Sequence, residues 1–180
     1  MRVRKGAAQE GQLGHALRKA WARPTVRSPE GTASGEGGYS MDKTYTKKAL
    51  TYEVAAKMVE AAMARAKELN CKQNVAVVDD GGNLKAFGRM DGAPLLGTEG
   101  CQRKAFTALF GVGTKEFSTA IKDRPELLIG LSHFSRATVV GGGLPITLDG
   151  EIIGGIGVGG GTEEQDIECA KAGLKILEQG

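Results

Sequence analysis

The sequence predicts an α+β domain in which an antiparallel sheet of about five strands is flanked by helices. Three observations predict this fold class. Two pairs of strand-like segments are each joined by a turn rich in Asp and Gly, at residues 79–83 and 149–150, and such turns join antiparallel strands. Segments with helical periodicity lie before, between and after the two hairpins. Helices in this order can cover both faces of one sheet.

Residues 50–69 are predicted to form the first helix, because apolar residues recur there at spacings of three and four. Thr51 can cap its first turn, since a threonine hydroxyl accepts a hydrogen bond from a free backbone amide. Asn70 suits the left-handed conformation that ends many helices. The apolar stripe is rich in alanine, so this helix can lie close against a sheet.

Residues 73–79 and 83–89 are predicted to form the first hairpin. The first strand contains the continuous apolar run 75–78, and a continuous run indicates a strand that is covered on both faces. In the second strand, small or apolar residues alternate with larger ones.

Two helices are predicted between the hairpins. Thr98 can cap the first, which runs to about Phe110, and the second covers residues 114–122. Pro125 is expected to end the second helix, because proline lacks the amide that a helix interior needs. Residues 126–133 form an apolar segment to which the sequence assigns no structure.

The second hairpin is predicted at residues 145–148 and 151–158. Residues 162–165 read Thr-Glu-Glu-Gln, a capping box in which the first and last side chains satisfy each other's free backbone amides. The last helix is therefore predicted from this point to about residue 178.

The glycine-rich end contains a formal dinucleotide fingerprint, G-x-G-x-x-G, at residues 155–160. The fingerprint also needs a further strand with an acidic residue about 20 positions on, which the remaining residues do not supply. Glu163, Glu164 and Asp166 would repel a pyrophosphate at the helix start. The glycines are therefore predicted to permit close backbone approach, either between subunits or around a ligand.

The charge of the chain is uneven. The first 40 residues carry seven Lys and Arg and three Asp and Glu, whereas residues 41–180 carry 17 and 18. A basic surface that binds nucleic acid is therefore not expected on residues 41–180. Residues 1–40 are predicted to be a disordered extension, either a tag, an upstream start or an Arg-rich transit peptide, and residues 41–180 to be one domain.

Cysteine usage and hydropathy bound the compartment. Cys71, Cys101 and Cys169 are widely spaced and form no C-x-x-C pair, which argues against a disulfide framework and a zinc site. No segment approaches the roughly 18 apolar residues that cross a membrane, and the first residues lack the apolar core of a secretory signal. The sequence predicts a cytoplasmic protein that binds neither membranes nor nucleic acid.

Polar residues gather around the first hairpin. Arg89 and Asp91 flank Met90 and lie on one side by strand alternation, where they can pair or where Arg89 can hold a ligand carboxylate. Asp79 and Asp80 can ligate a hard cation. Because Asp in a hairpin turn mainly bonds its own backbone, turn formation is the preferred interpretation for Asp80.

Residues 41–180 contain a single histidine, His133, which lies in an apolar segment. Such a histidine is more often structural than catalytic. No serine lies in a nucleophile motif, so acid–base or nucleophilic catalysis is poorly supported. Whether the protein is an enzyme stays open, and no catalytic residue is assigned.

Three segments together resemble the family of HbpS- and GlcG-like proteins, which includes the C-terminal domain of PduO-type corrinoid adenosyltransferases and OrfY-type proteins. They read VVDDGGNLKAFGRMDGAP at 77–94, RKAFTA at 103–108 and GGGLPITLDGEIIGGIGVGGGTEEQD at 141–166. The resemblance covers residues 50–180. It implies a profilin-like α/β/α fold with a five-stranded antiparallel sheet, and a homo-oligomer.

The resemblance also implies a haem site. In HbpS-like members a threonine in a KAFTA-like run is linked to haem binding, and Thr107 occupies that place. Lys104 lies on the same predicted helix, and Arg89, beside Met90 and Asp91, is the candidate propionate clamp.

The axial ligand of a haem iron is not assigned by the resemblance. PduO-like members link a histidine on the first helix to the iron, and residues 50–69 contain no histidine. A threonine hydroxyl is a weak iron ligand. Met58, Met63 and His133 are the other candidates.

The sequence is compatible with three functions. The first is a haem- or tetrapyrrole-binding accessory protein in haem or iron handling. The second is an enzyme or enzyme accessory for a small metabolite or corrinoid in a diol, glycerol or glycolate pathway. The third is a structural oligomerisation module without a ligand, which the near-neutral charge of residues 41–180 permits.

Overall fold

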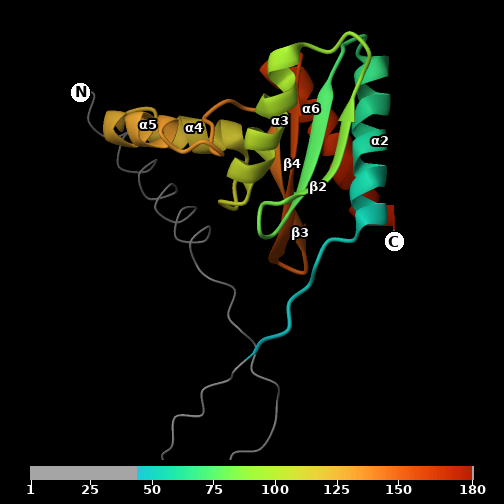
Figure 1. The fold of residues 1–180 in the computed structure, drawn as a ribbon, viewed down its shortest axis with the longest axis horizontal. Helices are drawn as coiled ribbons and strands as arrows, with labels where there is room; N and C mark the ends of the chain where they lie inside the picture. The colour runs from blue at the N-terminus through green and yellow to red at the C-terminus, as the bar shows by residue number, and fades with distance from the viewer. Residues whose placement is uncertain (1–43, 180) are drawn as a thin grey trace, which may run out of the picture.

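The computed structural model describes residues 44–179, so the predictions for residues 1–40 lie outside the described part of the chain. Figure 1 shows a twisted sheet with helices on both faces and two helices extending to one side. In chain order the elements are α2 (Tyr52–Glu68), β1 (Asn74–Asp79), β2 (Leu84–Arg89), α3 (Leu95–Ala108), α4 (Thr114–Ile121), α5 (Pro125–Ser132), β3 (Gly143–Leu148), β4 (Glu151–Gly159), α6 (Glu163–Leu174) and the 3₁₀ helix η1 (Lys175–Gln179).

Within residues 44–179 the sheet has four strands in the order β2-β1-β4-β3, and every neighbouring pair is antiparallel. The α+β class and both hairpins are confirmed, but the prediction of five strands is wrong. Residues 44–51 join no strand. Residues 126–133, which had no predicted structure, lie largely in α5, which Pro125 begins because the fixed φ of proline suits a first helical position.

The sheet separates two layers of helices. Helices α2 and α6 pack together on one face, and α3 covers the other. Strand β1 is buried on both faces, as its continuous apolar run predicts. Val75 and Val77 pack into the core under α2 and α6, whereas Ala76 and Val78 pack against Ala105 of α3.

Helix α3 lies directly on strand β4, and glycine makes this possible. A Cβ atom on Gly157 would overlap the carbonyl oxygen of Cys101, and one on Gly155 would overlap that of Ala105. The predicted close backbone approach is therefore present, but it joins a helix and a strand of one chain rather than two subunits. Most of the formal fingerprint lies inside β4, so these two glycines serve packing.

Local signals for helix ends are largely confirmed. The Thr51 hydroxyl accepts from the amide of Val54 at 3.4 Å, and Asn70 has a left-handed φ of 52°. The capping box of Thr162 and Gln165 is complete.

The start of α3 was predicted wrongly, because it begins at Leu95 rather than after Thr98. The hydroxyl of Thr98 lies inside the helix and donates to Oδ1 of Asn74 at 3.2 Å. The Thr98 side chain, which was predicted to cap the helix, thus bonds to Asn74 of β1 instead.

Helices α4 and α5 form an arm that projects from the body of the domain (Figure 1). Helix α5 packs against α4 and has no buried residue. No helix among residues 44–179 is long and apolar enough to span a bilayer.

The three cysteines are free. Cys101 and Cys169 are buried, and burial raises the pKa of both thiols to about 12. Both thiols therefore stay protonated and unreactive at neutral pH.

Candidate functional site

A cavity of about 460 Å³ opens between the first half of α3 and the start of α6, and we call it the main cavity. Its lining is mostly apolar, with Pro94, Leu96 and Val140 on its walls. Leu96 is 83% exposed and Val140 55% exposed. An open, largely apolar cavity of this size is typical of a small-molecule site.

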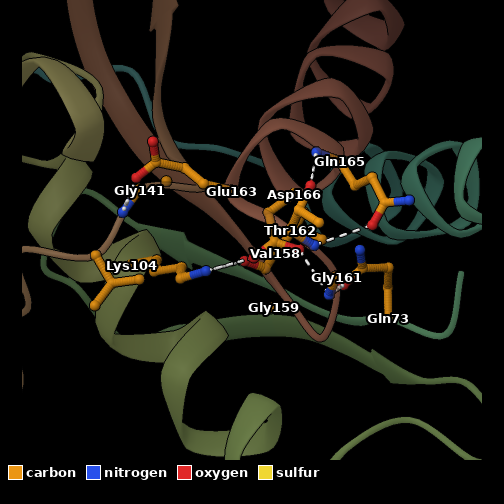
Figure 2. A network of polar contacts seen from close by, with 12 residues as sticks. Gln73, Lys104, Gly141, Val158, Gly159, Gly161, Thr162, Glu163, Gln165 and Asp166 are labelled. Atoms are coloured by element: carbon orange, nitrogen blue, oxygen red, sulfur yellow. Dashed lines mark hydrogen bonds and ion pairs between the residues drawn. The ribbon is translucent and has the colours of Figure 1, made fainter.

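A buried ion pair contributes to the lining of this cavity. Nζ of Lys104 lies 2.6 Å from Oδ2 of Asp166, and the two side chains are only 7% and 4% exposed. Nζ of Lys104 also donates to the carbonyl oxygen of Val158 at 2.9 Å (Figure 2). The pair therefore ties α3 to both β4 and α6.

The glycine loop between β4 and α6 is held from two sides, as Figure 2 shows. The amide of Gly161 donates to Oδ1 of Asp166 at 3.0 Å and to Oε1 of Gln73 at 3.1 Å. Because this amide is already bonded to protein groups, it is not free for a phosphate, which counts further against a nucleotide site.

Glu163 adds a second carboxylate to the cavity lining. Its Oε2 accepts from the amide of Gly141 at 3.2 Å, and its Oε1 lies 2.8 Å from Nζ of Lys115. The hydrogen bond and charge of Glu163 raise the pKa of that lysine. Lys115, on α4, therefore balances the negative charge of Glu163.

A smaller cavity of about 190 Å³ shares Glu99 and Arg103 with the main cavity. Arg103 pairs with Glu99 one helical turn away. Arg136 also lines the smaller cavity, where its guanidinium lies 4.3 Å from the centre of the Phe106 ring and donates to the carbonyl oxygen of Gly82. The chain therefore places two arginines around this cavity.

The predicted site residues are not brought together. Lys104 lines the main cavity, whereas Thr107 is fully buried and lines neither cavity. Arg89 and Asp91 are exposed and form no ion pair within 4.0 Å among the described residues, so the ion pair, one of the two alternatives for these residues, is not formed. Met90 is 7% exposed and belongs to the core, where its sulfur accepts from the amide of Gln73.

Thr107 holds the segment that lies between the two cavities. Its hydroxyl donates to the carbonyl oxygen of Arg103 and accepts from the amide of Thr138, both at 2.9 Å. Thr138 lines the main cavity and Arg136 the smaller one. Thr107 is thus placed to position residues 136–138.

Thr107→Val is expected to loosen this segment, because it keeps the side-chain shape and leaves the amide of Thr138 without its partner. The loss is expected to be about 1 kcal/mol in the free energy of unfolding, with faster hydrogen exchange at Thr138. Thr107→Ser should exchange like the wild type. Thr119→Val is the matched control, because the Thr119 hydroxyl donates only to the carbonyl of Lys115 on the surface. Equal exchange in the Val and Ser variants of Thr107 would contradict this role.

The two turn aspartates have different partners. Oδ1 of Asp79 accepts from the amides of Gly81 and Asn83, both at 2.9 Å. Burial acts to raise the pKa of Asp79, but these hydrogen bonds outweigh it and the pKa is lowered. Asp80, to which the turn role was assigned, instead pairs with Lys47 at 2.7 Å.

No group of three His, Cys, Asp or Glu side chains within residues 44–179 is arranged to hold a metal ion. His133 follows α5 and is exposed. Met58 is fully buried and Met63 packs against the same core. None of these three residues lines either cavity.

Sequence reasoning missed Arg103, Arg136, Glu163 and Asp166 as residues of the site. Arg103 could have been found from its spacing of four from Glu99 on a predicted helix. Arg136 lies in a segment with no predicted element, and Asp166 was interpreted only as a charge at a helix start. Their proximity depends on how α3, α6 and the 134–140 segment pack.

Comparison with known proteins decides the family. Residues 50–175 match the family described as haem degrading protein HbpS-like. The chain belongs to the HbpS-like family.

Relatives of this HbpS-like chain come from several settings. It is 38% identical over 141 residues to a 15.0 kDa protein from the dhaT-dhaS intergenic region of Citrobacter freundii, covering 77% of the chain and 99% of that protein. It is 32% identical over 140 residues to the corrinoid adenosyltransferase PduO of Salmonella typhimurium, covering 77% of the chain but only 42% of PduO. The HbpS-like chain therefore spans less than half of that enzyme.

A solved structure described as the PduOC:heme complex is also similar to the HbpS-like chain. The two share 32% sequence identity and superpose with a TM-score of 0.66, covering 72% of this chain and 95% of the other.

Proposed function

We propose that the HbpS-like chain binds haem or a related tetrapyrrole in the main cavity. The observation that carries the proposal is an open, mostly apolar cavity of about 460 Å³ in a chain that is 32% identical to a protein solved as a heme complex. The family description and that complex both link the family to haem.

The cavity residues fit the organic part of a haem better than its iron. Pro94, Leu96 and Val140 suit an apolar macrocycle, and Arg103 suits a propionate. The described lining contains no His, Cys, Met or Tyr, which are the usual axial ligands. Bound haem would supply a redox-active iron, and this chain's own residues would hold the ring and its carboxylates.

The proposal changes the part played by the residues that the resemblance implied. Arg103 is preferred to Arg89 as the partner of a propionate, because Arg103 lines the cavity. Lys104 and Thr107 are proposed to act by shaping the cavity rather than by touching the iron. Asp91 and Met90 have no part in the proposed contact.

Titration of the full chain with haem tests the proposal, with the Soret band as readout. Saturation at one haem per chain is expected. Gly100→Phe should abolish it, because Gly100 lines the cavity and a Cβ there meets no neighbouring atom within 4 Å, so a large ring can grow into the space. Lys57→Phe, at an exposed position of α2 that lines neither cavity, is the matched control. No Soret change in the wild type at stoichiometric haem would overturn the proposal.

A second candidate is an accessory role toward a corrinoid or a small metabolite. The match to PduO, a corrinoid adenosyltransferase, favours it. A melting screen of the full chain against cobalamins and small organic acids tests it. A rise in melting temperature with cobalamin but not with haem would favour this candidate, and a flat screen would remove it.

We also propose that the chain forms a homo-oligomer. Helix α5 contains Leu127, Leu128, Ile129 and Leu131 but has no buried residue, and apolar helix faces are normally covered. Light scattering tests the proposal, and a monomer at micromolar concentration would contradict it.

A further inference from the structure

We infer that Arg103 and Arg136 form a carboxylate-recognition subsite in the smaller cavity, which selects tetrapyrrole carboxylic acids whether or not they carry iron. The inference rests on the proposed function, because it assumes that the tetrapyrrole ring occupies the main cavity. It adds which chemical groups of the ligand decide affinity.

The two cavities are adjacent. Glu99 and Arg103 line both of them, so the side chain of Arg103 stands at their boundary. A planar ligand in the main cavity can therefore extend a flexible carboxylate arm past Arg103 into the smaller cavity, which Arg136 also lines.

Arg136 is a cation whose position is fixed by contacts with the protein. Its guanidinium is held over the ring of Phe106 and bonded to the carbonyl oxygen of Gly82. Among residues 44–179 no carboxylate lies within 4.0 Å of it. Gln102 and Ser135 add neutral hydrogen-bonding groups to the same cavity. A guanidinium held in this way can receive a carboxylate with little loss of side-chain entropy.

Within the described part of the chain, the one carboxylate that pairs with Arg103 is that of Glu99, and the contact is exposed. The side chains of Arg103 and Glu99 are 40% and 68% exposed, and such surface pairs are weak. A ligand carboxylate can therefore replace Glu99 as the partner of Arg103. Glu99 is then a competitor of the ligand, so removing its charge should strengthen binding.

Lys104 lines the main cavity, but it is not available to bind a ligand carboxylate. Its ammonium is matched by Asp166 inside the protein, and a ligand carboxylate would have to break that buried pair. Arg103 and Arg136 are therefore the two arginines that the cavities offer to an acid.

The test is a set of titrations of the full chain with haem, metal-free protoporphyrin IX and protoporphyrin IX dimethyl ester, followed by porphyrin absorbance. The wild type is expected to bind haem and protoporphyrin IX with similar affinity and the ester at least about tenfold more weakly, as expected for a lost charge-assisted hydrogen bond. Arg136→Gln should weaken binding of both acids by about tenfold and leave the ester unchanged. Glu99→Gln should strengthen binding of the acids by about twofold to fivefold.

Two controls separate this effect from misfolding and from general charge. Lys57→Ala removes an exposed cation of α2 that lines neither cavity and should bind like the wild type. Arg136→Gln keeps a donor for the carbonyl of Gly82, and its melting curve shows whether the fold is intact. Glu99→Gln is predicted to bind more tightly, which a folding defect does not produce.

The possible outcomes separate the inference from the proposed function. Equal affinity of the wild type for the acid and its ester, or unchanged acid binding in Arg136→Gln and Glu99→Gln, would overturn the inference while haem binding stands. Binding of haem but not of protoporphyrin IX would show that iron is required, and would overturn it too. Failure of the wild type to bind any of the three porphyrins would overturn the proposed function itself.

Discussion

Lys104→Ala is expected to lower the free energy of unfolding by about 3–5 kcal/mol. The reason is the environment of its partner. Asp166 has a side chain that is 4% exposed and lies 2.6 Å from the ammonium. Removal of Lys104 leaves this carboxylate buried without a counter-charge, and it also removes the donor to the carbonyl of Val158. The loss of one buried partner costs more than the pair contributes, because the remaining charge has lost its water.

Chemical denaturation of the full chain measures this change. The double variant Lys104→Met with Asp166→Leu should recover much of the lost stability, because it removes both charges and keeps the volume. Lys115→Ala, whose carboxylate partners lie on the surface, should unfold at the wild-type denaturant concentration. A Lys104→Ala variant as stable as Lys115→Ala would show that the pair is not a buried structural contact.

Gly157→Ala is the second large effect, with an expected loss of about 3 kcal/mol or more, at the upper end for overpacked sites. An added Cβ would overlap the carbonyl oxygen of Cys101 and approach the Cβ of Lys104 to 3.0 Å. Backbone atoms cannot rotate away as a flexible side chain can. Helix α3 would have to move off strand β4, and the wall of the main cavity would move with it.

Gly100→Ala is the matched control for this prediction, because Gly100 lies on α3, the helix that Gly157 contacts, and an added Cβ there meets nothing within 4 Å. Alanine at a helical position that tolerates it is expected to stabilise the chain by up to about 1 kcal/mol. Thermal unfolding of the two variants checks the contrast. If Gly157→Ala had the same melting temperature as Gly100→Ala, α3 and β4 would not be in close contact.

The parts of the fold that were predictable are those that depend on neighbouring residues. The turn at residues 79–83, the cap at Thr51 and the capping box at Thr162 were each readable, because their partners lie within four residues. The burial of β1 on both faces was readable from four consecutive apolar residues. A sheet of about five strands was expected from the order of the elements and from the resemblance, although the sequence identified segments for only four. The helix that forms α5 lacked a clear period.

The candidate site was less predictable. Thr107 was identified from the resemblance and Lys104 from its place on the same predicted helix, but their roles were not identified, because both depend on distant partners. The acceptor of the Lys104 ion pair is 62 residues away, and the amide that Thr107 holds is 31 residues away. Arg89 and Arg136 look equally suitable in the sequence, and only the packing places Arg136 beside a cavity.

The sequence by itself determined the class of the fold, the two hairpins, the helix caps at Thr51 and Thr162 and the family, because each is carried by local patterns or by a run of matching residues. The tertiary structure decided that the glycine motif of β4 admits a helix rather than a nucleotide, and that Lys104 meets Asp166 inside the protein. Both outcomes depend on which segments approach one another. A backbone contact between α3 and β4 and an ion pair across three elements arise only when the chain is packed, because the energy of burial depends on what surrounds each group.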